Sequence, residues 1–183
     1  MNANSRPVRR LVTADDENGN SKAIADGPAE DVRTDPARPG FSSTRIWVTN
    51  RTPPRIAGVQ KMPHGPHWLE PPPAGSVFRV DVFPPDDSYP GRVGKREVEA
   101  FFRSVGSPGA STYSASAPHP YMQRTRTLEF CLVLEGAITL VLDTQEVQLE
   151  AGDVVVLRGG NHAWSNRSSQ PCVVAFSSHD GAE

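Results

Sequence analysis

Residues 121–166 read YMQRTRTLEFCLVLEGAITLVLDTQEVQLEAGDVVVLRGGNHAWSN, and this stretch decides the fold. Its apolar runs are rich in β-branched and aromatic residues, which favour strands. Short turns separate these runs, among them Glu-Gly, Ala-Gly-Asp and Arg-Gly-Gly. The run PCVVAFSS follows at residues 171–178. Several short strands at this spacing are typical of an all-β sandwich or barrel.

The first run predicts one polar and one apolar face, because side chains two apart along a strand point the same way. A polar face inside a barrel is suited to holding a small ligand. A carboxylate on that face is costly unless it is paired or hydrated, so Glu129 should have a partner. The polar face would carry Gln123, Thr125, Thr127, Glu129, Cys131 and Val133, and the apolar face Phe130, Leu132 and Leu134.

Six residues of this stretch stand at the relative positions that the two sequence motifs of cupin barrels have, and the stretch resembles those motifs. They are Glu129, Gly136, Gly152, Asp153, His162 and Asn166. Two paired histidines of the first motif would stand at positions 123 and 125, where this chain has Gln123 and Thr125. The segments RTRT at 124–127 and NHAW at 161–164 resemble a subgroup of small single-domain cupins. In that subgroup a His commonly stands at the position of Gln123.

The resemblance implies an all-β fold, a double-stranded β-helix or jelly-roll barrel. It also implies that His162 projects into the same cavity as Glu129, and by alternation Trp164 faces the same way. We therefore predict Glu129 and His162 as catalytic residues, and Gln123, Thr125, Arg158 and Trp164 as substrate-binding residues. In the alternative interpretation, Glu129 is a structural carboxylate paired with Arg126 or Arg158.

The donor set argues against a resident metal, because protein sites for Fe, Mn, Ni or Zn usually combine three or four imidazole, carboxylate or thiolate groups. Glu129 and His162 are good donors, whereas Gln123 is a weak neutral one. We expect no cofactor; if a divalent metal binds weakly, its ligands would be Gln123, Glu129 and His162. The two histidines that the first motif would place at positions 123 and 125 are absent, which also disfavours a redox metal that activates oxygen.

Cupins of this kind often belong to small-molecule pathways, including secondary metabolism, so the resemblance implies a small-molecule substrate. Fold alone does not select a reaction. Proton transfer needs only a positioned acid and base, so we expect a lyase or isomerase that carries out dehydration, isomerisation, cyclisation or decarboxylation. The alternatives are a non-catalytic barrel that binds a small ligand and a metal-dependent oxygenase.

At 183 residues the chain suits one domain with extra segments. Residues 9–26 predict a β-hairpin around an Asn-Gly turn, so we expect a hairpin and loop extension over 1–40 and the barrel over 41–183. Further strands are expected within 43–50 and 75–83. A helix expected at 95–105 would either cover a barrel mouth or pack on the outside.

The net charge of −2, without a basic stripe, makes nucleic acid an unexpected partner. No apolar run is long enough to cross a membrane, so we expect a cytoplasmic protein. Cys131 and Cys172 should be buried thiols. The sequence pattern indicates no role for the three histidines His64, His67 and His119. We expect all three to lie in loops. The hairpin and the apolar outer strand faces need cover, which predicts a homodimer.

Overall fold

A computed structural model describes residues 6–56, 61–62 and 65–182. These residues form eleven strands, one α-helix and one 3-10 helix, so the predicted all-β fold is confirmed. The elements are β1 (Arg9–Asp15), β2 (Ser21–Pro28), β3 (Val32–Thr34), β4 (Ser42–Thr49), β5 (Ser76–Phe83), η1 (Asp86–Ser88), α1 (Lys95–Ser104), β6 (Thr127–Glu135), β7 (Ala137–Leu142), β8 (Glu146–Glu150), β9 (Val154–Arg158), β10 (His162–Ser165) and β11 (Cys172–Asp180).

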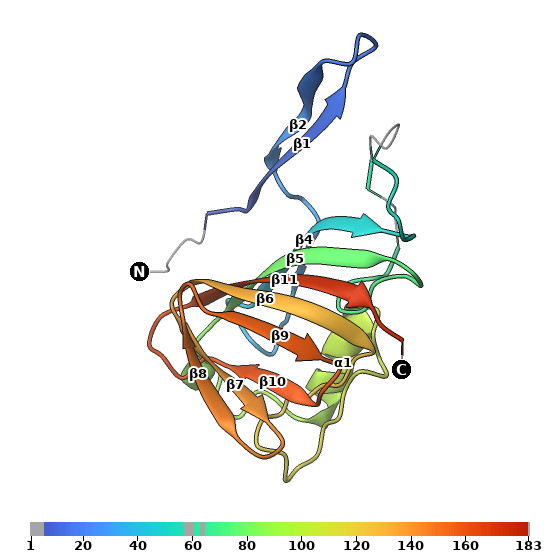
Figure 1. The fold of residues 1–183 in the computed structure, drawn as a ribbon. Coiled ribbons are helices and arrows are strands. Elements are labelled where there is room, and N and C mark those ends of the chain that lie inside the picture. The colour runs from blue at the N-terminus through green and yellow to red at the C-terminus, as the bar shows by residue number, and fades with distance from the viewer. Residues whose placement is uncertain (1–5, 57–60, 63–64, 183) are drawn as a thin grey trace.

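Two antiparallel sheets form the barrel. The larger has the strand order β3-β4-β5-β11-β6-β9, and the smaller has the order β10-β7-β8. Their inner faces lie opposite each other, with α1 beside the open end near β9 and β10 (Figure 1). The six-stranded sheet already includes β3, and the predicted boundary at residue 40 stays a prediction.

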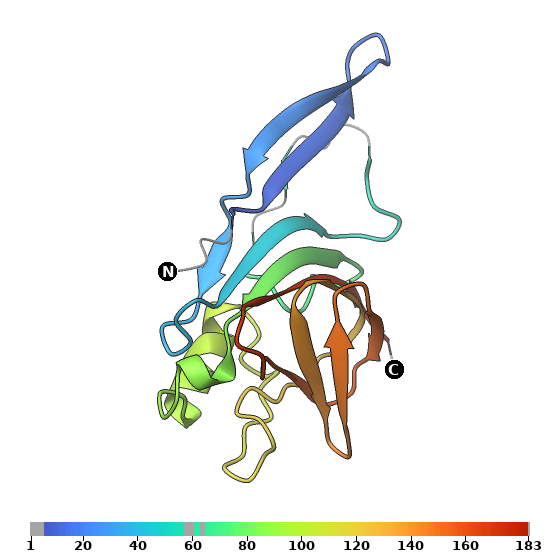
Figure 2. The same ribbon diagram turned by 90° about the vertical axis from the view of Figure 1, so that its left-hand side faces the viewer.

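The N-terminal hairpin is a separate two-stranded sheet of β1 and β2. Its turn is closed by Asp16, whose Oδ1 accepts hydrogen bonds from the backbone N–H groups of Asn18 and Asn20. Gly19 adopts a φ of 78°, which suits glycine in this turn. The hairpin predicted from the Asn-Gly turn is confirmed, and it projects beyond β4, away from the barrel (Figures 1 and 2).

Helix α1 packs against the barrel core through Val98, Phe101 and Phe102. Phe101 and Phe102 also line the cavity inside the barrel. Of the two positions considered for this helix, the structure therefore favours the one that covers a barrel mouth. The helix closes the core at the end where Gln123 and Tyr121 lie.

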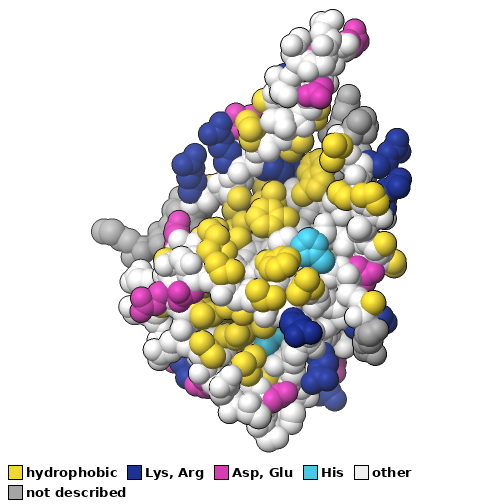
Figure 3. All heavy atoms as spheres, viewed as in Figure 1, with side chains coloured by type: hydrophobic (Ala, Val, Ile, Leu, Met, Phe, Trp, Pro, Cys, Tyr) yellow, Lys and Arg dark blue, Asp and Glu magenta, His cyan; other side chains and the backbone are white. Residues whose placement is uncertain are grey.

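Strand β6 alternates buried and exposed side chains, as its sequence predicts. Its polar side chains face inward and its leucines and Phe130 face outward, the reverse of an ordinary amphipathic strand. The outer face of the six-stranded sheet is consequently apolar (Figure 3). Its exposed hydrophobic side chains are Phe78, Leu128, Phe130, Leu132, Leu134, Val154 and Val156.

Candidate functional site

The interior polar face predicted for residues 123–133 is present. All six side chains are buried, whereas the intervening Arg124 and Arg126 are exposed. Gln123 also forms an antiparallel backbone pair with His162, which joins the segment before β6 to β10. This pairing brings the two motif segments together inside the barrel.

Glu129 and His162 meet in this interior. Glu129 comes from β6 and His162 from β10, and they are only 2 % and 1 % exposed. Glu129 Oε2 lies 4.0 Å from His162 Nε2. The predicted acid–imidazole pair is therefore assembled, in a setting with little water to screen its charges.

The orientation of the His162 ring is fixed on both sides. A carbonyl oxygen can only accept, so the 2.9 Å contact to the Gly160 carbonyl places a proton on His162 Nδ1. The Nε2 lone pair then accepts from the Gln123 side-chain amide at 3.2 Å. Burial lowers the pKa of His162, although the Glu129 carboxylate opposes that shift. The imidazole is therefore uncharged near neutral pH, with its basic nitrogen turned towards Glu129.

Gly159 forms the turn that places His162 inside the barrel. Its φ of 72° lies in the left-handed region, and a Cβ there would meet the Thr125 carbonyl oxygen at 3.1 Å. The following Gly160 has open space around it and supplies the carbonyl that holds His162.

Arg79 of β5 is the partner of Glu129. Its Nη1 lies 3.5 Å from Glu129 Oε1, and the two side chains are 2 % and 3 % exposed. Ser178 bridges them: Arg79 Nη1 donates to Ser178 Oγ at 3.0 Å, and Ser178 Oγ donates to Glu129 Oε1 at 2.5 Å. Oxygen Oε1 is thus held by Arg79 and Ser178, while Oε2 faces His162.

The pairing of Glu129 with Arg126 or Arg158, considered from the sequence, does not occur. Arg126 and Arg158 are both exposed, and Arg158 lines a hollow on the outside of the barrel. Arg158 therefore does not take the predicted substrate-binding position in the interior, because it ends β9 on the outward-facing side of the pleat. Arg79 of β5, rather than Arg158, lines the interior cavity.

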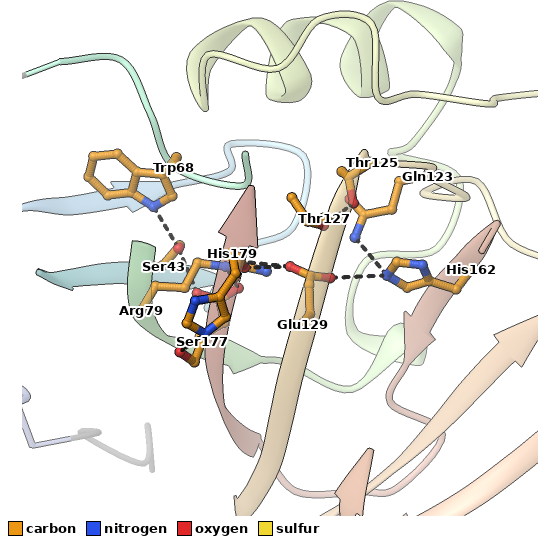
Figure 4. A network of polar contacts seen from close by, with 12 residues as sticks. Ser43, Trp68, Arg79, Gln123, Thr125, Thr127, Glu129, His162, Ser177 and His179 are labelled. Atoms are coloured by element: carbon orange, nitrogen blue, oxygen red, sulfur yellow. Dashed lines mark hydrogen bonds and ion pairs between the residues drawn. The ribbon is translucent and has the colours of Figure 1, made fainter. Parts of the chain in front are cut away.

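The network extends from Arg79 across the sheet to Ser43 and Trp68 (Figure 4), and Asp81 connects Arg79 with Ser43. Arg79 Nε donates to Asp81 Oδ2 at 3.1 Å, and Ser43 Oγ donates to Asp81 Oδ1 at 2.6 Å. Trp68 Nε1 in turn donates to Ser43 Oγ at 2.7 Å. A connected chain of polar contacts therefore runs from Trp68 through five strands to His162.

Burial and charge act against each other in this network. Burial raises the pKa of Asp81, and the neighbouring Arg79 only partly offsets it. For Arg79, burial alone would lower the pKa, but the attraction of Asp81 and Glu129 outweighs it and the pKa is raised. The guanidinium therefore stays charged and anchors two carboxyl groups that would otherwise be unpaired.

Sequence reasoning missed Arg79 and Asp81, although a signal was present. In the strand sequence SVFRVDVF they share a face with Val77, and two opposite charges two residues apart in an apolar strand indicate an internal ion pair. The structure places both at 3 % exposure or less.

Thr125 and Trp164 are both buried, but of the two only Trp164 lines the interior cavity, whereas Thr125 lines the outer hollow together with Arg158. The hydroxyls of Thr125 and Thr127 lie 2.6 Å apart, so each has the other as a partner. Trp164 packs edge-on against His162 and Phe176, with ring centroids 6.3 Å and 5.3 Å away. It lines the interior cavity together with Gln123 and Arg79.

His119 and His67 lie away from this site. His119 is buried in a loop, with its Nε2 3.7 Å from Asp86 Oδ2, and lines a different hollow. His67 is half-buried, and its backbone carbonyl accepts from Arg45. His64 falls outside the described residues. Cys131 and Cys172 are free and buried, as predicted, and burial raises the pKa of both thiols.

The Cupin domain family model matches residues 110–178, the segment that contains both motifs, β6 to β10 and most of β11. The chain carries a cupin domain. This confirms the resemblance read from the spacing of Glu129, Gly136, Gly152, Asp153, His162 and Asn166.

Fungal relatives of this cupin come from biosynthesis clusters. It is 52 % identical over 48 residues to the phomopsin biosynthesis cluster proteins C′ and D of Diaporthe leptostromiformis, covering 26 % of this chain and 25 % of each relative. It is 44 % identical over 50 residues to the oryzines biosynthesis cluster protein J of Aspergillus oryzae, covering 27 % and 28 %. The matched segment thus spans about a quarter of the length of these relatives.

Solved structures similar to this cupin include a Cupin 2 conserved barrel domain protein from Salinispora arenicola. It has a TM-score of 0.39 at 16 % identity, covering 76 % of each chain. The cupin domain of Cnp3 from Schizosaccharomyces pombe has a TM-score of 0.46 at 8 % identity, covering 94 % of this chain and 87 % of the other.

The site does not fit the divalent metal that cupins often hold. Gln123, Glu129 and His162 do come together, but His162 Nε2 is in contact with an amide nitrogen and Glu129 Oε1 with Ser178 and Arg79. A guanidinium 3.5 Å from the only carboxylate of the set repels a dication. Within the described residues, no group of three or more His, Cys, Asp or Glu side chains could hold a metal ion.

No helix in the described part of the chain is long and apolar enough to span a membrane.

Proposed function

We propose that this cupin is an enzyme of a small-molecule biosynthetic pathway that moves a proton on a carbonyl-bearing substrate without a metal. The observation that carries the proposal is the buried contact of 4.0 Å between Glu129 Oε2 and His162 Nε2. A buried carboxylate beside an imidazole is a workable acid–base pair, because the imidazole can take up a proton and the carboxylate stabilises the resulting charge. The fungal relatives in biosynthesis clusters support the pathway class.

His162 is the base in this scheme. Its uncharged imidazole accepts a proton at Nε2 from the carbon next to the substrate carbonyl, and Glu129 stabilises the imidazolium that results. Return of that proton to another substrate atom completes an isomerisation. Delivery to a hydroxyl leaving group instead completes an elimination with loss of water. Either outcome restores neutral His162 and is of the lyase or isomerase type.

In this scheme the side-chain amide of Gln123 changes its hydrogen-bond partner when the substrate binds. Its amide N–H occupies the His162 lone pair at 3.2 Å, and it must release that nitrogen before His162 can accept a proton. The released amide then becomes a donor for the developing negative charge on the carbonyl oxygen, as does Arg79, which lines the same cavity.

The test begins with native mass spectrometry of the purified protein, which identifies a ligand carried through purification. Conversion of that compound is then followed by liquid chromatography and mass spectrometry. We expect Glu129→Gln to lower turnover about a hundredfold or more while the circular dichroism spectrum is unchanged. The conservative variant Thr127→Ser, which keeps the hydroxyl next to Thr125, should retain activity. Unchanged turnover in Glu129→Gln contradicts the proposal.

A non-catalytic ligand-binding barrel is the second candidate, and it is favoured by one observation. The interior cavity measures only about 30 Å³, and Glu129 is already paired with Arg79 and Ser178. A ligand that is bound but never converted, with or without added metal and oxygen, would support this candidate. Elemental analysis of protein purified without chelator tests the metal-dependent oxygenase, since stoichiometric metal is required only there.

A further inference from the structure

Two buried donors of the interior cavity have no acceptor. Among the residues that the structure describes, neither Arg38 Nη2 nor Trp164 Nε1 has a hydrogen-bond partner. Both side chains line the same cavity, and the residues are 3 % and 5 % exposed. A buried donor left without a partner destabilises the protein, and more so when it is charged. Two such donors around one cavity indicate an acceptor-bearing ligand.

Arg38 is held rigidly. Its guanidinium carbon lies 3.6 Å from the Tyr121 ring centroid, 4.0 Å from that of Phe41 and 4.6 Å from that of Phe101. Its Nε donates to Asp35 Oδ2 at 2.8 Å. These contacts fix the plane of the guanidinium before any ligand arrives, which reduces the entropy lost on binding.

Asp35 does not satisfy the whole guanidinium, because its two oxygens are shared. Oδ2 also accepts from the Tyr121 hydroxyl at 2.6 Å, and Oδ1 accepts from the Ala37 backbone N–H at 2.9 Å. The ion pair therefore runs through Nε, and Nη2 of this cavity-lining residue is left without an acceptor. A guanidinium edge next to a neutral N–H donor matches a carboxylate, which offers two oxygens and a negative charge.

We propose that the substrate of this cupin is a small carboxylic acid whose carboxylate binds between Arg38 Nη2 and Trp164 Nε1. This inference rests on the proposed function, since it names the substrate class of the same site. The cavity of about 30 Å³ accommodates a group of carboxylate size rather than a whole substrate. The reacting carbon would then lie on the side of the cavity lined by Gln123 and Arg79.

Phe101 separates this cavity from an outer hollow. It lines both the interior cavity and a surface groove of about 420 Å³ between α1 and residues 34–37. Asp35 and Ala37, whose neighbour is Arg38, line the outer side. In this proposal the Phe101 ring rotates when the acid binds, Tyr121 and Phe41 continue to hold Arg38, and the body of the acid extends into the groove.

The test uses acetate, crotonate and benzoate as probes, each compared with its neutral amide. Binding is measured by calorimetry and by the ¹⁵N–¹H resonance of the Trp164 indole, assigned with Trp164→Phe. We expect at least one acid to bind ten or more times as tightly as its amide and to shift that resonance. Equal affinity for acid and amide, or no shift with any acid, overturns the proposal and leaves a bound water as the only acceptor.

Arg38→Met should remove the preference for the acid, while Arg96→Met, at the exposed edge of the groove, should keep it. If Arg38→Met fails to fold, Trp164→Phe still tests the site, because it removes one donor and keeps the ring; we expect its affinity for the acid to fall about tenfold. Undiminished binding in Trp164→Phe would overturn the proposal.

Glu129→Gln separates this inference from the proposed function. It should lose turnover but bind the acid within about threefold of the natural chain, because Glu129 makes no contact with Arg38 or Trp164 in the contacts described above. Acid binding without turnover in the natural chain would contradict the proton chemistry alone. Turnover of a neutral compound without acid binding would contradict the carboxylate site alone.

Discussion

Arg79 of β5 and Glu129 of β6 lie on the same inner face of the six-stranded sheet, with Nη1 and Oε1 3.5 Å apart and Ser178 of the intervening β11 bridging them. The pair leaves Glu129 Oε2 as the oxygen that faces His162. Arg79 is therefore a positioning residue: it determines which carboxylate oxygen is available to the imidazole and supplies the charge that keeps two buried carboxyl groups in the core.

Arg79→Met should destabilise the protein by about 3–5 kcal/mol, because it leaves Glu129 and Asp81 without a cation in the core. Chemical denaturation followed by circular dichroism measures the loss. The exposed Arg124→Met is the matched control and should change the free energy of unfolding by about 0.5 kcal/mol or less. Similar effects of the two substitutions would contradict the buried ion pair.

The sequence predicted the barrel because its strand pattern, glycine turns and motif spacing are all local. The resemblance to cupins implied that Glu129 and His162 share the interior, and in the structure alternation along β6 and the turn at Gly159 orient both inward. Which cation pairs with Glu129 depends on the pairing of β11 with β5 and β6, a long-range contact that spacing does not encode. Nearby Arg126 and Arg158 were therefore considered, and Arg79 was missed.

The sequence also could not predict that donors of Arg38 and Trp164 lack hydrogen-bond partners. Trp164 was predicted as a cavity residue by alternation, but an unpaired N–H is recognised only when all neighbours are placed. Arg38 belongs to a loop in the segment predicted as an extension over residues 1–40. It reaches the cavity because α1 and the segment around Tyr121 pack against it.

Gly159→Ala should lower stability by about 1–2 kcal/mol, the cost of a side chain in the left-handed region. Its Cβ would also press on the Thr125 carbonyl oxygen at 3.1 Å and displace the turn that carries His162. Gly160→Ala is the matched control, because it has open space and keeps the carbonyl that accepts from His162. Thermal denaturation distinguishes them, and equal shifts in Tm would refute the special role of Gly159.

His162 should titrate below its ordinary pKa of 6.5, because burial disfavours the imidazolium. Proton NMR of the ring, assigned with His162→Gln, measures this directly. As the pH drops below about 6.5, the imidazole is protonated in the unfolded chain while His162 of the folded chain stays neutral. The free energy of unfolding therefore falls in this range. Glu129→Gln should lower the pKa of His162 further, since it removes an attractive charge. A pKa at or above 6.5, or a rise in Glu129→Gln, would contradict the described geometry.

The predicted homodimer has a suitable surface in the outer face of the six-stranded sheet. Phe130 lies beside Val156 and Ser177 on the neighbouring strands, and the face continues to Phe78 on β5. Seven apolar side chains there are 37 % to 65 % exposed, more than monomers usually leave in one patch. An apolar face can pack against a copy of itself, and a stable dimer buries about 800 Å² per partner. We propose that a second copy of the chain covers it.

Phe130→Glu should convert the dimer to a monomer of 19.8 kDa, because two buried carboxylates would face each other across the two-fold axis. Sedimentation velocity measures the mass, and the exposed position of Phe130 allows the variant to fold. Val147→Glu is the matched control, since Val147 is similarly exposed but lies on the three-stranded sheet, so this variant should stay dimeric. Dissociation by both variants, or a natural chain that sediments as a monomer, would rule out this face as the interface.

Deletion of residues 1–28 tests separately whether the projecting hairpin contributes, because its loss should then weaken the dimer without abolishing the contact through Phe130.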